Sequence, residues 1–116
     1  MNEITTGHYL DKLIRRRGQI VMTLRHLANE QKQVEQNTDW LDQSAYESRV
    51  NLLDRLSEWY VTEIGQIDEA IKRIESNRYG VCVACREAIE DASLETAPEA
   101  EFCSICQELR DGLRCL

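Results

Sequence analysis

The stretch of sequence that decides the fold is Asp39-Trp40-Leu41-Asp42-Gln43-Ser44-Ala45. It is the only break in a helical periodicity of apolar residues that otherwise runs from about Leu10 to about Ile74. The residues before it predict one long helix, and the residues after it predict a second. We therefore interpret the stretch as the tip of a helical hairpin, which carries two carboxylates and no basic residue.

The composition favours helices and excludes some partners. The 116 residues include five Gly and a single Pro, and Glu, Gln, Arg and Leu are frequent. A net charge of −7 argues against general attraction to nucleic acid or to anionic membranes. No apolar run approaches membrane length, and the first residues show no signal pattern. We expect a monomer with no membrane contact, in a reducing cytoplasm.

The apolar stripes of the two predicted helices match each other. An antiparallel pairing in which partner numbers add up to 84 gives nine layers, five of them apolar on both sides. The mirror point of this pairing is Asp42, inside the proposed tip. The predicted layers are Leu10–Ile74, Leu13–Ile71, Arg17–Ile67, Ile20–Ile64, Leu24–Tyr60, Leu27–Ser57, Gln31–Leu53, Val34–Val50 and Thr38–Tyr46. This agreement predicts a hairpin rather than one long helix that dimerises.

Local signals set the boundaries of the hairpin. Ser44 followed by Glu47 is a capping-box pattern, which predicts that the second helix begins near Ala45. Gly80 predicts that this helix ends near Asn77. We expect a flexible lead-in over residues 1–7 and a hairpin over residues 8–78, with its tip at residues 38–45.

Four cysteines follow the hairpin in two CxxC pairs that are separated by seventeen residues. Each pair offers two sulfurs from one tight turn, and four sulfurs complete a tetrahedral Zn²⁺ shell. We therefore predict one structural zinc ion, rather than a disulfide or a redox dithiol, in a zinc finger over residues 79–106. The predicted ligands are Cys82, Cys85, Cys103 and Cys106. Cys115 falls outside the pattern, and we expect a free thiol there.

The zinc finger is acidic, with Arg86 as the only basic residue between Tyr79 and Cys106. This composition argues against direct or sequence-specific binding of nucleic acid. No catalytic constellation is present, so we do not expect an enzyme, and His8 and His26 are expected in solvent. A short C-terminal helix is expected over residues 107–116, with Ser104 or the metal knuckle as its start. Its apolar residues, Ile105, Leu109 and Leu113, suit a closing helix.

The hairpin, the segment Tyr79-Gly80-Val81-Cys82-Val83-Ala84-Cys85, Pro98 and the segment Cys103-Ser104-Ile105-Cys106 together resemble the DksA/TraR family of bacterial transcription regulators. The resemblance implies binding to RNA polymerase, with the hairpin tip inserted into the secondary channel. The family's tip pattern, DxxDxA, falls on Asp39, Asp42 and Ser44, where Ser stands in place of the usual Ala. The exposed apolar residues Trp40 and Leu41 at the tip would also suit a partner.

Two further positions depart from the family. Arg86 replaces the usual Gly after the second cysteine, which predicts strain in the first knuckle. Gln66 and Ala97 stand where some relatives carry basic residues for the alarmone ppGpp. A phosphate-rich ligand needs cations, so we expect a weak or absent ppGpp response.

Other interpretations remain open at the level of sequence. Asp42 or Ser44 could serve only as a helix cap, and Asp39 only as a turn residue. The whole chain could be a zinc-clasped adaptor that binds a protein other than RNA polymerase.

Overall fold

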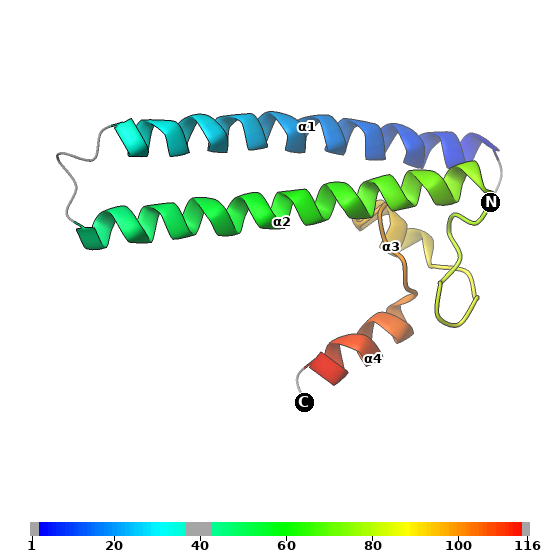
Figure 1. The fold of residues 1–116 in the computed structure, drawn as a ribbon. Coiled ribbons are helices and arrows are strands. Elements are labelled where there is room, and N and C mark those ends of the chain that lie inside the picture. The colour runs from blue at the N-terminus through cyan, green and yellow to red at the C-terminus, as the bar shows by residue number, and fades with distance from the viewer. Residues whose placement is uncertain (1–2, 37–42, 115–116) are drawn as a thin grey trace. The chain divides into compact units, whose positions relative to one another are not determined.

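A computed structural model describes residues 3–36 and 43–114 and contains four helices in those ranges. Figure 1 shows them in chain order: α1 (Glu3–Gln36), α2 (Gln43–Glu75), α3 (Asp91–Thr96) and α4 (Ser104–Arg114). The described residues contain no strand, only an isolated antiparallel bridge between Val81 and Ala88. The predicted fold class is confirmed, because two long paired helices precede a four-cysteine module and a short C-terminal helix. None of the helices in these ranges is both long and apolar enough to span a bilayer.

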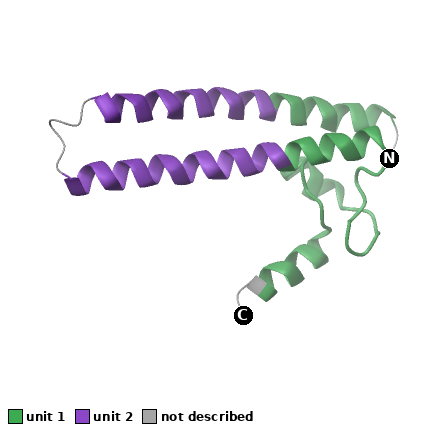
Figure 2. Cartoon of the chain, viewed as in Figure 1, with its two compact units in different colours: residues 1–15, 66–116 green, residues 16–65 purple. Residues whose placement is uncertain are grey.

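The chain divides into two compact units (Figure 2). Unit 2 is residues 16–65, and unit 1 is residues 1–15 together with residues 66–116. In each unit a segment of α1 lies antiparallel to a segment of α2. The two units are described in turn.

Unit 2 is a two-helix segment with the predicted apolar seam. Ile20, Val34 and Leu53 are buried in it. Polar pairs flank the seam: the Arg16 guanidinium lies 2.9 Å from the Glu63 carboxylate, and Arg49 lies 3.2 Å from Glu30. The half-buried seam positions of this unit are Leu24, Leu27, Gln31, Tyr46, Val50, Ser57, Tyr60 and Ile64. The heptad pattern therefore predicted the buried face of both helices.

Unit 1 combines the other ends of α1 and α2 with the cysteine module. Its core includes Leu13, Ile67, Ala70 and Leu94, each fully shielded from solvent. Leu94 comes from α3, so this short helix packs its apolar residue into the same core. The predicted seam continues here, because Leu10, Ile71 and Ile74 are half-buried. Arg17, just inside unit 2, is the one described seam position that is exposed.

The start of the first helix differs from the prediction. Helix α1 begins at Glu3, so residues 3–7 are helical and the expected flexible lead-in is wrong for them. Thr5, Thr6 and Gly7 have low helix propensity, which suggested a lead-in. All three are half-buried, and packing of a helix face outweighs propensity differences of this size.

Both predicted ends of the second helix also need correction. Helix α2 begins at Gln43, so Ser44 lies inside the helix and is not its N-cap. The Glu47 carboxylate instead accepts a hydrogen bond of 2.9 Å from the Gln43 side chain. At the other end, the N–H of Arg78 bonds to the Arg73 carbonyl and Asn77 has a φ of 58°. This is a Schellman stop with Asn, rather than Gly80, in the left-handed position.

The C-terminal part contains one helix that the sequence did not predict and one that differs in packing. Helix α3 was missed because its six residues are too few to show periodicity. Helix α4 begins at Ser104, which is one of the two starts that the sequence predicted. Its apolar residues Ile105, Leu109 and Leu113 are 68%, 64% and 71% exposed, so within unit 1 they do not close a core as expected.

Candidate metal centre

The first cysteine pair is held in a tight loop by backbone hydrogen bonds. The N–H of Cys82 donates to the Glu87 carbonyl at 2.8 Å, and the N–H of Arg86 donates to the Cys82 carbonyl at 3.0 Å. The N–H of Cys85 points at the Cys82 sulfur at 3.5 Å. An N–H directed at a sulfur stabilises a thiolate, so this loop is suited to present metal ligands.

The second pair spans the start of α4, with Cys103 just before the helix and Cys106 in its first turn. Glu90 holds this helix start in place, because its carboxylate accepts bonds from the Ser104 N–H at 3.3 Å and hydroxyl at 3.0 Å. The pKa of Glu90 is lowered by its own backbone N–H and by these two bonds. Glu90 therefore caps α4 from a position fourteen residues earlier in the chain.

The four sulfurs form one cluster. Each ligand sulfur of Cys82, Cys85, Cys103 and Cys106 lies within 4.8 Å of the other three, and those of Cys85 and Cys103 are 3.7 Å apart. A tetrahedral zinc ion with Zn–S bonds of about 2.3 Å requires sulfurs about 3.8 Å apart. A disulfide needs about 2.05 Å, so the cluster fits a metal and not a cross-link. The described cysteines are all free thiols.

The cluster contains one thiol that ionises readily. Burial raises the pKa of Cys82, but hydrogen bonds from the backbone N–H groups of Cys85, Cys103 and Ala84 outweigh burial and lower it to about 6. Hydrogen bonds with Cys103 and Cys82 raise the pKa of Cys106 to about 12. The backbone N–H groups around Cys82 therefore favour its thiolate form. A bound cation would favour the fully deprotonated set.

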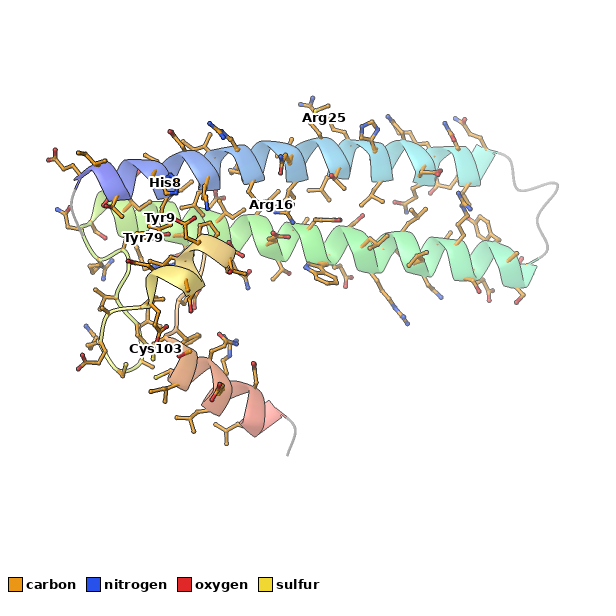
Figure 3. All side chains as sticks on the ribbon, turned by 180° about the vertical axis from the view of Figure 1, so that it is seen from behind. His8, Tyr9, Arg16, Arg25, Tyr79 and Cys103 are labelled. Atoms are coloured by element: carbon orange, nitrogen blue, oxygen red, sulfur yellow. The ribbon has the colours of Figure 1, made fainter. Side chains whose placement is uncertain are left out.

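A network of aromatic and charged side chains ties the module to the hairpin ends of unit 1. The rings of Tyr9 and Tyr79 lie 5.8 Å apart, and the Tyr79 hydroxyl donates to the Pro98 carbonyl at 2.7 Å (Figure 3). His8 and Lys12 of α1 both contact the Glu95 carboxylate of α3. His8 is thus an ion-pair or hydrogen-bond partner, and not simply solvated as expected. No local pattern revealed these contacts, which join residues more than eighty positions apart.

Comparison with known proteins gives DksA proteins and one uncharacterized relative. No protein-family model matches the chain. The RNA polymerase-binding transcription factor DksA of Caulobacter vibrioides is 29% identical over 109 residues, which are 93% of this chain and 77% of the relative. The structure of transcription factor DksA2 from Pseudomonas aeruginosa is similar with a TM-score of 0.90 at 25% identity, covering 100% of this chain and 90% of that chain.

The chain is similar to DksA proteins, in sequence over most of its length and in fold over all of it.

An uncharacterized protein of Aquifex aeolicus is also similar, with 34% identity over 70 residues. This match covers 60% of this chain, which spans about half (48%) of the Aquifex protein. The two DksA relatives are described as transcription factors, in agreement with the prediction of a non-enzymatic protein.

Most of the predicted tip lies outside the described residues. This holds for Asp39, Trp40, Leu41 and Asp42, and also for Cys115 near the C-terminus. Ser44 is described, and its side chain is exposed in the first turn of α2.

The two positions expected to weaken ppGpp binding lie close together in the structure. Gln66 and Ala97 line one pocket of about 640 Å³ in unit 1. Arg110 is the only basic residue among the described residues that line it, and its guanidinium lies over the Phe102 ring at 5.1 Å. The acidic residues of the pocket are Glu99, Glu101 and Glu108. The pocket therefore repels polyanions more than it attracts them.

Proposed function

We propose that this chain is a bacterial transcription regulator that binds RNA polymerase and inserts the tip of its hairpin into the secondary channel. The observation that carries the proposal is the full-length similarity to DksA2, a transcription factor, at a TM-score of 0.90. The DksA relative from Caulobacter, which is described as RNA polymerase-binding, supports the partner.

In this proposal the two tip aspartates act on the polymerase. A carboxylate that enters the channel can compete for cations or reposition basic groups near it, because charge interactions strengthen where water is excluded. Trp40 and Leu41 would contact apolar surface in the channel. Ser44, exposed on α2, would modulate the effect rather than cause it.

Zinc would have a structural role in this mechanism. Cys82, Cys85, Cys103 and Cys106 would hold the ion and leave no coordination position open to water or substrate. The module would then keep the loop from Gly80 to Ile89 and the start of α4 in fixed positions for the partner. Weak or absent ppGpp binding at Gln66 and Ala97 is part of the proposal, because Arg110 is the single basic residue that lines the pocket, against three glutamates.

The test is transcription from sensitive promoters with purified RNA polymerase, comparing the wild type with the double variant Asp39→Asn, Asp42→Asn. We expect the variant to bind polymerase with nearly unchanged affinity and to lose most of the effect on initiation. The matched control is Asp54→Asn, which removes a carboxylate from the flank of α2. Equal activity of the tip variant and the wild type would refute the role of the aspartates.

An adaptor for another protein is the second candidate, and one observation favours it. On α2, Leu52 and Trp59 are 57% and 70% exposed, and Leu56 lies between them at helical spacing. Such a stripe on a hairpin flank suits a protein partner of any identity. A pull-down that recovers a different protein and no polymerase subunit would favour this candidate.

A further inference from the structure

A second pocket, separate from the one at Gln66, lies beside the first cysteine pair. It has a volume of about 450 Å³ and is lined by residues of unit 1 only. Three arginines line it, which is a high density for a chain with fourteen basic residues and a net charge of −7. We call it the arginine pocket and define it by Arg73, Arg78, Arg86, Asn77, Val81 and Val83.

Arg86 is held in a conformation that disfavours an arginine. Its φ is 66°, in the left-handed region where a residue with a Cβ is strained and glycine is not. The left-handed conformation turns the chain after Arg86, and the carbonyl of the next residue, Glu87, accepts a hydrogen bond from the Cys82 N–H at 2.8 Å. That bond involves only the backbone, so a glycine would form it equally well. The fold therefore requires the left-handed conformation at this position but does not require an arginine there.

The side chain of Arg86 also has no structural task. It is exposed, and within the described residues its guanidinium forms no hydrogen bond or ion pair. Backbone strain that the fold does not require points to function when the side chain that it carries faces a pocket. Arg73 differs, because its guanidinium also holds the Glu99 and Ala100 carbonyls at 3.4 Å and is thereby fixed in place.

The charges and apolar residues of the pocket restrict the ligand. Glu69 and Glu101 also line it, and Glu69 is shared with Lys72 at 3.4 Å. These two carboxylates would repel a compact dianion such as phosphate. A single carboxylate carries less charge and can pair with one guanidinium fork at a time. Val81 and Val83 are 38% and 45% exposed, and both line the pocket. They offer an apolar contact between the cations.

We propose that the arginine pocket binds an acidic segment of a protein partner, with carboxylates paired to Arg86 and Arg73 and an apolar side chain on Val81 and Val83. The site adds a second contact to the molecule beyond the hairpin tip. It does not require that the partner be RNA polymerase. Charge complementarity and the two exposed valines together select a peptide over a free anion.

The test is a titration of the zinc-loaded full chain followed by NMR of arginine Nε–H groups and valine methyl groups. The probe is the peptide acetyl-Glu-Leu-Glu-Leu-Glu-amide, and the comparison ligands are its Gln counterpart and inorganic phosphate. We expect saturable shifts at Arg86, Val81 and Val83 with the Glu peptide, and binding roughly tenfold weaker for each comparison ligand. Absence of saturation, equal binding of the Gln peptide, or tighter binding of phosphate would each overturn the proposal.

Variants at one position complete the test. Arg86→Gly removes the guanidinium and also the backbone strain, so the variant should fold, and we expect roughly tenfold weaker peptide binding. Arg86→Lys keeps the charge without the fork and should bind with intermediate affinity. Arg25→Gln, at an exposed arginine of unit 2 (Figure 3), should bind like the wild type. Unchanged binding by Arg86→Gly would refute the assignment.

Discussion

At the residue scale, the left-handed backbone of Arg86 makes a quantitative prediction about stability. Replacing Arg86 with Gly should raise the free energy of unfolding by about 1 kcal/mol, because the φ of 66° costs glycine nothing. Denaturant unfolding of the zinc-loaded protein measures this change. Asn77→Gly is the matched control, with a φ of 58° and a smaller expected gain, since Asn tolerates this region. A lower free energy of unfolding for Arg86→Gly than for the wild type would contradict the claim that the backbone is strained at Arg86.

The buried hydroxyl of Tyr79 predicts a loss of stability at high pH. Burial, and next the neighbouring Tyr9, raise the pKa of Tyr79 well above its usual value of 10.0. A raised pKa means that the folded state holds the proton more tightly than the unfolded state does. The stabilisation is therefore complete below about pH 10 and is lost as the pH rises towards the folded-state pKa.

The variant that tests this effect is Tyr79→Phe. At neutral pH it should lose about 1 kcal/mol, because the bond to the Pro98 carbonyl is gone. Above pH 10 its stability should fall less steeply than that of the wild type, although Tyr9, whose pKa burial also raises, keeps part of the slope. Tyr46→Phe, at a half-buried position in unit 2, serves as the control. Parallel pH profiles for wild type and Tyr79→Phe would contradict the argument.

At the element scale, replacing either of two helix-interior glycines is predicted to stabilise the protein. A Cβ added at Gly18 or Gly65 meets nothing within 4 Å. Gly18→Ala and Gly65→Ala should therefore each raise the free energy of unfolding by about 1 kcal/mol through helix propensity. Thermal unfolding measures both changes. Gly80→Ala is the control with the opposite sign, because Gly80 has a φ of 82°. If the helix substitutions destabilise, these glycines have a role that their surroundings do not show.

The helices were predictable because their signal is local and repeated. The heptad stripe predicted the buried positions from Leu10 to Ile74, since every described seam residue except Arg17 is buried or half-buried. Helix ends were less predictable, because they depend on single residues. Ser44 looked like a cap and is not, and Asn77 rather than Gly80 ends α2. The missed helix α3 has only one fully buried residue, Leu94, and offers no period to detect.

The site also has features that a local sequence pattern predicts and features that it does not. The clustering of the four sulfurs followed from CxxC spacing, since each pair is brought together by one local turn. The ties of Tyr79 to Pro98 and of His8 to Glu95 join distant parts of the chain and leave no mark in either segment. The arginine pocket was likewise not predicted. The one available signal was Arg86 at the position where the family that the sequence resembles usually has Gly.

At the scale of the whole molecule, the two units should respond differently to loss of metal. The seam of unit 2 contains no cysteine, whereas the core of unit 1 includes Cys82 and Cys103. We expect a zinc chelator to remove hydrogen-exchange protection from residues 79–106 while unit 2 keeps most of its helical circular dichroism signal. Cys82→Ser should have the same effect without chelator, and Cys115→Ser should have none. Simultaneous loss of structure in both units on removal of the metal would contradict the expectation that they respond differently.

The central claim is that the hairpin tip enters the secondary channel of RNA polymerase. Site-specific photo-crosslinking from position 43 tests it most directly, because Gln43 is the first described residue of the predicted tip and is exposed. A probe at position 25, on the exposed flank of α1, is the control. The proposal predicts crosslinks from position 43 to polymerase segments that line the channel near the active site. Crosslinks only to the outer surface of polymerase, or none in a mixture where binding is saturated, would contradict it.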